Sequence, residues 1–215
     1  AVEAQLAPYL RHRRTGRPWV VLKLAASLDG RTAGPDGTSQ WLTGVEARAD
    51  GHRIRAESDA VIVGAGTVRA DDPSLTVRLA EGDDPLRVVL GRAPSDARVH
   101  PALELDGDLG EVLDHLGALD VLQVLVEGGA TVAGAFHRAG LVDRYVVYLA
   151  PKLFGGDDGR PLFSGPGAPT LADVVEGRIE SVTRLGPDLR VDLVPSSAPA
   201  RTSAPSEEAH SMEPA

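Results

Sequence analysis

The chain has 215 residues, of which 42% are hydrophobic and 25% charged, with a formal net charge of −9 and no cysteine. These values are ordinary for one globular domain with a sizeable core, and they argue against a collagen-like or disordered chain. The negative charge disfavours nucleic acid as a partner, and the lack of cysteine excludes disulfides, thiolate nucleophiles and cysteine-bound zinc.

The N-terminal segment, residues 1–17, predicts a short basic helix over 3–13 that leads into the folded region at Pro18. Its basic run 11–14 (RHRR) is interpreted as a solvated face. The segment has no apolar core of signal-peptide length, and no apolar run in the sequence approaches the length of a membrane span. We therefore expect a cytoplasmic protein with no membrane partner.

Between residues 18 and 195, short runs rich in Val and Leu alternate with helical patterns. The runs are bounded by Gly, Pro or Asp, which is typical of strands. The predicted strands are 19–25, 60–64, 86–91, 121–127 and 144–150, and the predicted helices are 44–57, 109–118 and 130–140. Apolar strands separated by helices indicate an α/β fold with a mostly parallel sheet covered on both faces.

The last part of this region predicts an antiparallel hairpin, which makes the sheet mixed. RIESVTRLG and DLRVDLV flank the turn residues Gly186, Pro187 and Asp188. Residues 196–215 are rich in Ser, Ala, Pro and Glu, and they cannot bury enough apolar surface to offset the entropy of ordering. This segment is predicted to be a disordered tail.

The strongest local motif is VLVEGGATVAGAF, residues 124–136, in which a strand runs into Glu127, two glycines and a helix that begins near Ala130. Glycines let a backbone approach a ligand closely, and a helix N-terminus offers free N–H groups. The turn therefore predicts a pyrophosphate cradle at the carboxyl end of a strand, with Glu127 pointing into the same crevice. The alternative is a tight turn without a ligand, in which Glu127 caps the helix.

A second strand-to-turn motif is AVIVGAGTVRADDPSLTVR, residues 60–78. The dinucleotide pattern G-x-G-x-x-G fails there, because Arg69 stands at the last glycine position. Thr67, Asp71 and Arg78 nevertheless follow a strand end, and their side chains suit a ribose or a phosphate. The alternatives are a helix cap at Thr67, an Asp-Pro turn after Asp71 and a solvated arginine at Arg78.

Lys23 lies inside the apolar strand 19–25, and the chain has only one other lysine, Lys152. A buried ammonium is costly unless it is paired, so Lys23 is predicted to be a functional group matched to a carboxylate or a substrate. The alternative is an ammonium that reaches water from the strand end. Lys152 is interpreted as a surface or rim residue.

Several common catalytic motifs are absent from the sequence, namely G-x-S-x-G, the G-x-x-x-x-G-K-[ST] phosphate loop and H-E-x-x-H. The six histidines are scattered at positions 12, 52, 100, 115, 137 and 210, and no two have metal-ligand spacing. We therefore expect no metal site.

Four segments together resemble the reductase domain of the bacterial riboflavin-biosynthesis family RibD. They are RPWVVLKLAASLDGRTA (17–33), TSQWLTG (38–44), ESDAVIVGAGTVRADDPSLTVR (57–78) and VEGGATVAGAF…VVYLAPKLFGG (126–156). The resemblance covers roughly residues 1–195 and implies a dihydrofolate-reductase-like fold, with a central mixed sheet between helices. It also implies an NADPH-dependent reductase that converts the ribosyl group of 5-amino-6-(5-phospho-D-ribosylamino)uracil to a ribityl chain.

The resemblance assigns residues to a substrate site and a cofactor site. The substrate positions are Lys23, Ser39, Arg55, Leu75, Arg78 and Glu127. The NADPH positions are Ala25, Trp41, Thr67, Asp71, Gly129, Ala130, Thr131, Val132, Ala133, Gly134 and Ala135. Ser39, Trp41 and Arg55 rest on the resemblance alone. Core packing is the alternative for Trp41, and a solvated helix face is the alternative for Arg55.

The implied reaction is hydride transfer from the nicotinamide to C1 of the open-chain sugar, as imine or aldehyde, with a proton delivered to nitrogen or oxygen. Lys23 and Glu127 are the candidates to donate or organise that proton. Arg78, with Arg55, is the candidate to hold the 5′-phosphate, and Ser39 to orient it.

The expected partners are the phosphorylated aminopyrimidine substrate and a second copy of the chain, because the family is commonly homodimeric through this domain. Two alternatives to the implied function stay open. One is an NADPH reductase of the same fold that acts on another pyrimidine or pterin-like substrate. The other is a nucleotide-binding module without turnover.

The choice of NADPH also has a local argument at Arg92, which directly follows the strand 86–91. In dinucleotide sites a carboxylate beyond a strand end selects NADH, whereas an arginine pairs with the 2′-phosphate of NADPH. No acidic residue comes between Arg92 and Asp96, so the local sequence shows no repulsion of that phosphate. Arg92 is predicted to bind it, and a solvated loop arginine is the alternative.

This sequence departs from the family in one respect, which concerns the deaminase activity that family proteins combine with the reductase. Family proteins usually carry an N-terminal zinc deaminase with an H-x-E and P-C-x-x-C signature, and this sequence has no cysteine. A truncated or split bifunctional enzyme and a stand-alone reductase paralogue both fit. We favour the first, because AVEAQLAPYLRHRRTG resembles the linker helix that follows the deaminase.

Overall fold

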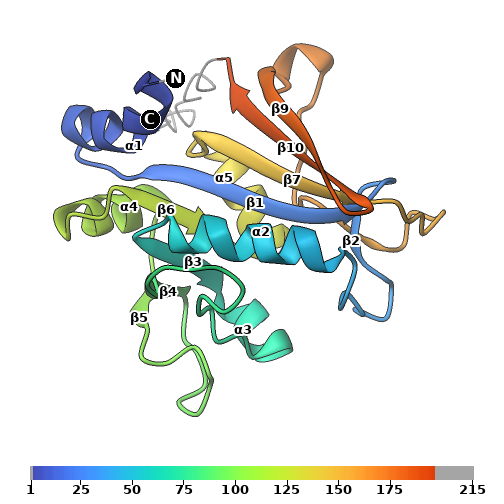
Figure 1. Cartoon of the computed structure of the whole chain (residues 1–215), viewed down its shortest axis with the longest axis horizontal. Helices are drawn as coiled ribbons and strands as arrows, with labels where there is room; N and C mark the ends of the chain where they lie inside the picture. The colour runs from blue at the N-terminus through green and yellow to red at the C-terminus, as the bar shows by residue number, and fades with distance from the viewer. Residues whose placement is uncertain (1, 197–215) are drawn as a thin grey trace, which may run out of the picture.

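Figure 1 shows the computed structural model of the chain, which describes residues 2–196. A central sheet has eight strands in the order β5-β4-β3-β6-β1-β7-β10-β9. They are β1 (Trp19–Ser27), β3 (Ala60–Gly64), β4 (Leu86–Leu90), β5 (Leu103–Leu105), β6 (Gln123–Val126), β7 (Arg144–Ala150), β9 (Gly177–Leu185) and β10 (Asp188–Pro195). The strands from β5 to β7 pair in parallel, and β10 pairs antiparallel with β7 and β9. A separate small sheet joins β2 (Arg31–Ala33) to β8 (Arg160–Pro161).

Helices cover both faces of the sheet, and each face has its own apolar core (Figure 1). The helices α2 (Val45–Ala56) and α3 (Ala65–Asp71) pack on one face, where Ile54 and Val68 meet Val21 and Val63 of the strands. The helices α4 (Leu109–Ala118) and α5 (Ala130–Arg138) pack on the other, where Leu113 and Phe136 are fully buried. The predicted α/β class with a mostly parallel, mixed sheet is confirmed.

The five predicted strands, the three predicted helices and the hairpin are all present, with ends shifted by a few residues. The structure adds four short elements that the sequence did not indicate: α3, β2, β5 and β8, together with a turn of 3-10 helix at Leu171–Asp173. The strands among them have only two or three residues, too few for an alternating pattern. The glycines at the start of α3 favoured a turn, because glycine is a poor helix former.

The basic N-terminal segment differs from its interpretation. The helix α1 spans Val2–Thr15, and Arg13 and Arg14 are exposed as expected. Arg11, however, pairs with Asp143 at 3.6 Å, and His12 Nε2 lies 3.0 Å from the carbonyl oxygen of Gly117. A fully solvated face is therefore wrong, because the end of α1 packs against α4 and the start of β7.

Two expectations at the C-terminal end also change. The turn of the hairpin is Gly186-Pro187, with Gly186 at a φ of +61°, whereas Asp188 begins β10 and is buried. Its Oδ2 accepts a hydrogen bond from the Gly44 amide at 2.6 Å and so fixes the start of α2. Ser196, expected in the tail, donates its amide to Glu176, and residues 197–215 lie outside the described part of the chain. No helix among the described residues is long and apolar enough to cross a membrane.

Candidate active site

Two cavities open where the carboxyl ends of the parallel strands meet at one edge of the sheet. The larger, of about 1200 Å³, extends over the ends of β1, β6, β3 and β4. The smaller, of about 580 Å³, lies between α2 and the segment that follows α3. Lys23, Thr67, Asp71 and Glu127 line both cavities, so the two meet at these four residues.

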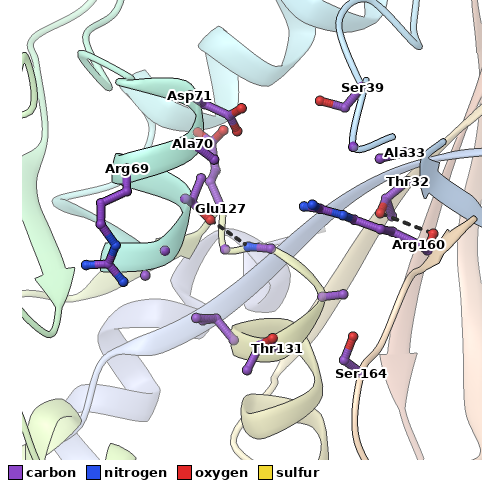
Figure 2. Close-up of a pocket in the computed structure, with 18 of the residues that line it drawn as sticks. Thr32, Ala33, Ser39, Arg69, Ala70, Asp71, Glu127, Thr131, Arg160 and Ser164 are labelled. Carbon is purple, nitrogen blue, oxygen red and sulfur yellow. Dashed lines mark hydrogen bonds between the residues drawn. The ribbon is translucent and has the colours of Figure 1, made fainter. Parts of the chain in front are cut away.

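The carboxylate of Glu127 is the centre of a group of charges at this junction, and Figure 2 shows it pointing into the pocket. Its Oε1 accepts from Arg55 Nε at 2.9 Å, and its Oε2 lies 3.8 Å from Lys23 Nζ. Burial raises the pKa of Glu127, but the positive charges of Lys23 and Arg55 outweigh it, so the pKa lies below its ordinary value. Glu127 is therefore ionised at neutral pH, and Lys23 pairs with it while its side chain stays 25% exposed at the junction of the two cavities.

Arg55 links this group to the segment 72–78. It is 8% exposed, which excludes the solvated helix face, and its Nη1 donates to the carbonyl of Thr76 at 2.6 Å. Within the segment Leu75 is buried at a φ of +53°, a region that costs energy for a branched side chain. The Arg78 amide donates to His52 Nδ1 at 3.1 Å. These contacts hold the segment in one conformation beside the smaller cavity.

The outer end of the smaller cavity carries two guanidinium groups that converge on Ser74. Arg78 Nη1 donates to Ser74 Oγ at 2.6 Å and to Thr76 Oγ1 at 2.9 Å, and Arg98 Nη2 lies 3.5 Å from Ser74 Oγ. Neither guanidinium pairs with a carboxylate within residues 2–196, and the one carboxylate bonded to these two residues is Asp72, which accepts the backbone amide of Arg98 at 2.8 Å. Both are exposed and line the cavity, an arrangement that suits a phosphate.

The Gly128-Gly129 turn brings the start of α5 to the larger cavity. Gly129 is the N-cap residue and has no side-chain cap, so the first amides of α5 remain available to a ligand. The Gly129 amide itself donates weakly to Thr67 Oγ1 at 3.3 Å. A Cβ on Gly128 would lie 2.5 Å from the Cβ of Val132, so this glycine is required by packing inside the turn.

The predicted cofactor positions on α5 divide into two groups. Gly129, Ala130, Thr131 and Val132 line the larger cavity. Ala133, Gly134 and Ala135 do not, because the helix turns them away from it. Ala133 and Gly134 are buried, and a Cβ on Gly134 would lie 2.3 Å from the carbonyl oxygen of Ser164.

The remaining predicted residues lie around the cavity mouths. Ala25 and Ser39 line the larger cavity, whereas Trp41 lines the smaller one. Trp41 is 65% exposed, which excludes core packing, and the Arg48 guanidinium lies 4.7 Å from its ring centre. Lys152 Nζ donates to the carbonyls of Trp41 and Leu42, so it supports this segment.

Arg92 lines the larger cavity, but its surroundings differ from the expectation. Its guanidinium lies 3.3 Å from Glu104 Oε2 and 3.3 Å from Asp106 Oδ2. The expectation that no acid stands near Arg92 is wrong, because β5 pairs beside β4 and brings both carboxylates to it.

Among the cavity-lining residues that sequence reasoning missed, the basic side chains matter most: they include His52, Arg69, Arg98 and Arg160. His52 had a usable signal, because Arg48, His52 and Arg55 recur at helical spacing and share one face of α2. Arg160 had none. It comes from the short strand β8, and Figure 2 shows it opposite Arg69, with Glu127 between them.

Residues 18–191 match the family described as the RibD C-terminal domain. The chain belongs to this family. It is 44% identical over 198 residues to the riboflavin biosynthesis protein RibD of Mycobacterium tuberculosis, covering 88% of this chain and 58% of the relative. It is 36% identical over 229 residues to RibD of Escherichia coli, covering 86% of this chain and 62% of the relative. The chain thus spans about three fifths of the length of these RibD proteins.

Solved RibD structures share its fold. One form of Acinetobacter baumannii RibD superimposes with a TM-score of 0.83 at 34% identity, covering 91% of this chain and 63% of that one. A Thermotoga maritima protein, described as a diaminohydroxyphosphoribosylaminopyrimidine deaminase/5-amino-6-(5-phosphoribosylamino)uracil reductase, gives 0.79 at 30% identity, covering 90% and 61%. The resemblance to the RibD reductase domain and its dihydrofolate-reductase-like fold are confirmed.

Proposed function

We propose that this RibD-family domain reduces the ribosyl group of 5-amino-6-(5-phospho-D-ribosylamino)uracil to the ribityl chain in riboflavin biosynthesis, with NADPH as the reductant. The observation that carries the proposal is the meeting of two cavities at the paired side chains Lys23 and Glu127. A hydride transfer requires a dinucleotide and its acceptor to touch at one point, next to a group that handles a proton. The description of the Thermotoga protein supports the choice of substrate.

The larger cavity is the proposed NADPH site, because its donors fit a dinucleotide. The free amides at the start of α5 suit the pyrophosphate. Thr67 and Asp71 stand at the junction, where a ribose or an amide needs hydrogen-bond partners. Asp71 and Gly66 are exposed on α3, and a Cβ on Gly66 would meet nothing within 4 Å, so the wall of the cavity is open there.

Lys23 is the proposed proton donor. Bound NADPH would supply a hydride, and reduction at C1 of the open-chain sugar would also need a proton at the imine nitrogen or the aldehyde oxygen. Glu127 is held ionised by its two cationic partners and has no proton to give at neutral pH. Lys23 carries N–H donors at the same junction, so it donates while Glu127 fixes its position.

The smaller cavity is the proposed site of the phosphorylated pyrimidine. Arg78 binds the 5′-phosphate, because its guanidinium is exposed at the cavity and bonded only to the hydroxyls of Ser74 and Thr76. Arg55 does not share this task, since it already bonds Glu127 and the Thr76 carbonyl. It positions the segment that carries Arg78.

A direct assay tests the function: NADPH oxidation, followed at the absorbance of the reduced nicotinamide, with and without the phosphorylated aminopyrimidine. Oxidation that depends on this substrate, with a much higher KM for the dephosphorylated compound, is the expected result. NADPH binding without turnover would instead indicate a nucleotide-binding module. Turnover of another pyrimidine or pterin, with none of the aminopyrimidine, would indicate a different reductase.

We also propose that the chain forms a homodimer through β9. This strand is the last of the sheet and has no partner on its outer side within the described residues. Ile179 and Val182 are 57% and 59% exposed on it. An exposed apolar edge strand is a liability in a monomer, and a second copy of the chain covers it.

A further inference from the structure

The larger cavity has a far end, distant from the proposed chemistry, at the end of β4. Lys23 on β1 marks the place of hydride transfer, and β6 and β3 separate β1 from β4. Neighbouring strands are about 4.8 Å apart, so three steps across the sheet cover roughly 14 Å. An extended dinucleotide with its nicotinamide at Lys23 therefore brings its adenosine to the end of β4.

Two arginines line this far end, and they differ in charge environment. Arg92 faces Glu104 and Asp106, each at 3.3 Å. The Glu104 carboxylate accepts from the Ala93 amide at 3.0 Å, and this bond, with the Arg92 charge, lowers the pKa of Glu104 against the effect of burial. One cation with two carboxylates has a net charge of about −1, which repels a phosphate.

Arg69 has no such neighbours. No carboxylate within residues 2–196 pairs with it, and its one hydrogen bond runs from Nη1 to the carbonyl oxygen of Arg92 at 3.3 Å. A guanidinium has five N–H donors, so most of those on Arg69 remain available. Its side chain is exposed, and Figure 2 shows it extending from α3 on the side of the pocket away from Arg160.

We propose that Arg69, and not Arg92, pairs with the 2′-phosphate of NADPH and sets the preference for NADPH over NADH. This inference rests on the proposed NADPH-dependent function. Arg69 replaces the last glycine of the dinucleotide pattern, and it brings a free guanidinium to the adenosine end. Arg92 instead stabilises the edge of the sheet through its ion pairs with Glu104 and Asp106.

The test compares Arg69→Ala with the matched variant Arg92→Ala in equilibrium binding by calorimetry. The ligands are adenosine 2′,5′-bisphosphate and 5′-AMP, which differ in the 2′-phosphate, followed by NADPH and NADH.

Arg69→Ala is expected to weaken the binding of the bisphosphate and of NADPH by about 10- to 100-fold, and to change the affinity for 5′-AMP and NADH less than about 3-fold. Arg69→Lys should recover part of the loss. Arg92→Ala should change the ratio of the two affinities much less. Both side chains are exposed, and thermal unfolding checks that both variants fold.

The outcomes separate this inference from the proposed function. Wild-type protein that shows no preference for the 2′-phosphate would overturn the NADPH assignment, and the role of Arg69 with it. Wild-type preference that survives Arg69→Ala, or a larger selective loss in Arg92→Ala, would overturn Arg69 alone and leave NADPH in place. An equal loss of both nucleotides in Arg69→Ala would also remove it as the specificity residue.

Discussion

At the residue scale, the candidate site depends on how three side chains share charge. Glu127 is one carboxylate between two cations, Lys23 and Arg55. The arrangement keeps Glu127 ionised and fixes both cations in place, because buried charges are tolerated only when they are paired. A proton donor next to an immobile carboxylate is a suitable partner for a reaction in which charge develops on the substrate nitrogen or oxygen.

Lys23→Ala and Glu127→Ala are each expected to abolish most turnover while the protein stays folded. Loss of a proton donor costs about 10²- to 10⁴-fold in kcat. Glu127→Ala also leaves two cations unpaired in a mostly buried place, which should lower the free energy of unfolding by about 3–5 kcal/mol. Steady-state kinetics and chemical denaturation measure the two effects, with Arg13→Ala on the exposed part of α1 as the control. Near-normal rates in either variant remove that residue from the mechanism.

His52 provides a pH-dependent contact in the same region. Burial lowers its pKa below the ordinary 6.5, assisted by the charges of Arg55, Arg78 and Lys23 and opposed by Glu127. The ring is therefore neutral at pH 7, and its Nδ1 can accept the Arg78 amide. Protonation removes this acceptor and releases one anchor of the proposed phosphate-binding segment.

Acid is therefore expected to raise the KM for the phosphorylated substrate more than it lowers kcat, as the pH falls through the folded-state pKa of His52, which lies below 6.5. Stability falls in the same direction, because below 6.5 the unfolded state binds a proton at this position that the folded state does not. His52→Gln keeps an acceptor and cannot titrate, so its KM and stability should change less with pH. His137, whose pKa is also lowered by burial, remains in both proteins as an internal control. Identical KM profiles for the two proteins would exclude this role.

At the scale of elements, α2 connects the candidate site to the C-terminal hairpin. One part of it presents His52 and Arg55 to the smaller cavity. Asp50, on the same helix, accepts from Tyr148 at 2.6 Å and from Arg190 at 2.7 Å. These bonds join α2 to β7 and β10, so the position of the cavity wall depends on a buried group of charges outside the cavity.

Asp192→Ala is expected to be strongly destabilising. Asp192 is 2% exposed and accepts two hydrogen bonds from Arg190 at 2.9 Å each. Removing it leaves Arg190 short of a partner, and breaking a buried pair in this way costs about 3–5 kcal/mol. Asp114→Ala, which removes a surface pair with Arg17 outside β9, should cost far less, because exposed ion pairs contribute little to stability. Denaturant titration measures both, and equal costs would show that the buried group does not support the sheet.

At the scale of the whole molecule, the proposed homodimer through β9 predicts that a charge introduced on this strand separates the two subunits. Wild-type protein should sediment as a dimer at micromolar concentration, and Val182→Asp should shift it to a monomer by placing a charge in the apolar interface. Leu6→Asp changes a similarly exposed leucine on α1 and should leave the dimer intact. A wild-type monomer, or a dimer unaffected by Val182→Asp, contradicts the proposed interface.

The sequence by itself determined the layers of this protein and the two residues at the centre of its candidate site. Alternating apolar runs and helical patterns were enough for the sheet and its covering helices, because burial on both faces leaves a continuous apolar strand. Lys23 stood out because an ammonium in such a strand needs a partner, and Glu127 because it ends a strand next to two glycines. Both signals are local and follow from the cost of burying charge.

Only the tertiary structure decided which distant residues meet. Arg55 pairs with Glu127 across 72 positions of the chain, and no local pattern contains that contact. The carboxylates beside Arg92 belong to Glu104 of β5 and to Asp106 directly after it, and the sequence did not indicate the place of this three-residue strand in the sheet. The order of strands sets which side chains become neighbours, and it is chosen by the packing of the whole chain. For that reason the local argument at Arg92 missed the charges around it, and only the folded molecule showed that Arg69 has no carboxylate partner within residues 2–196.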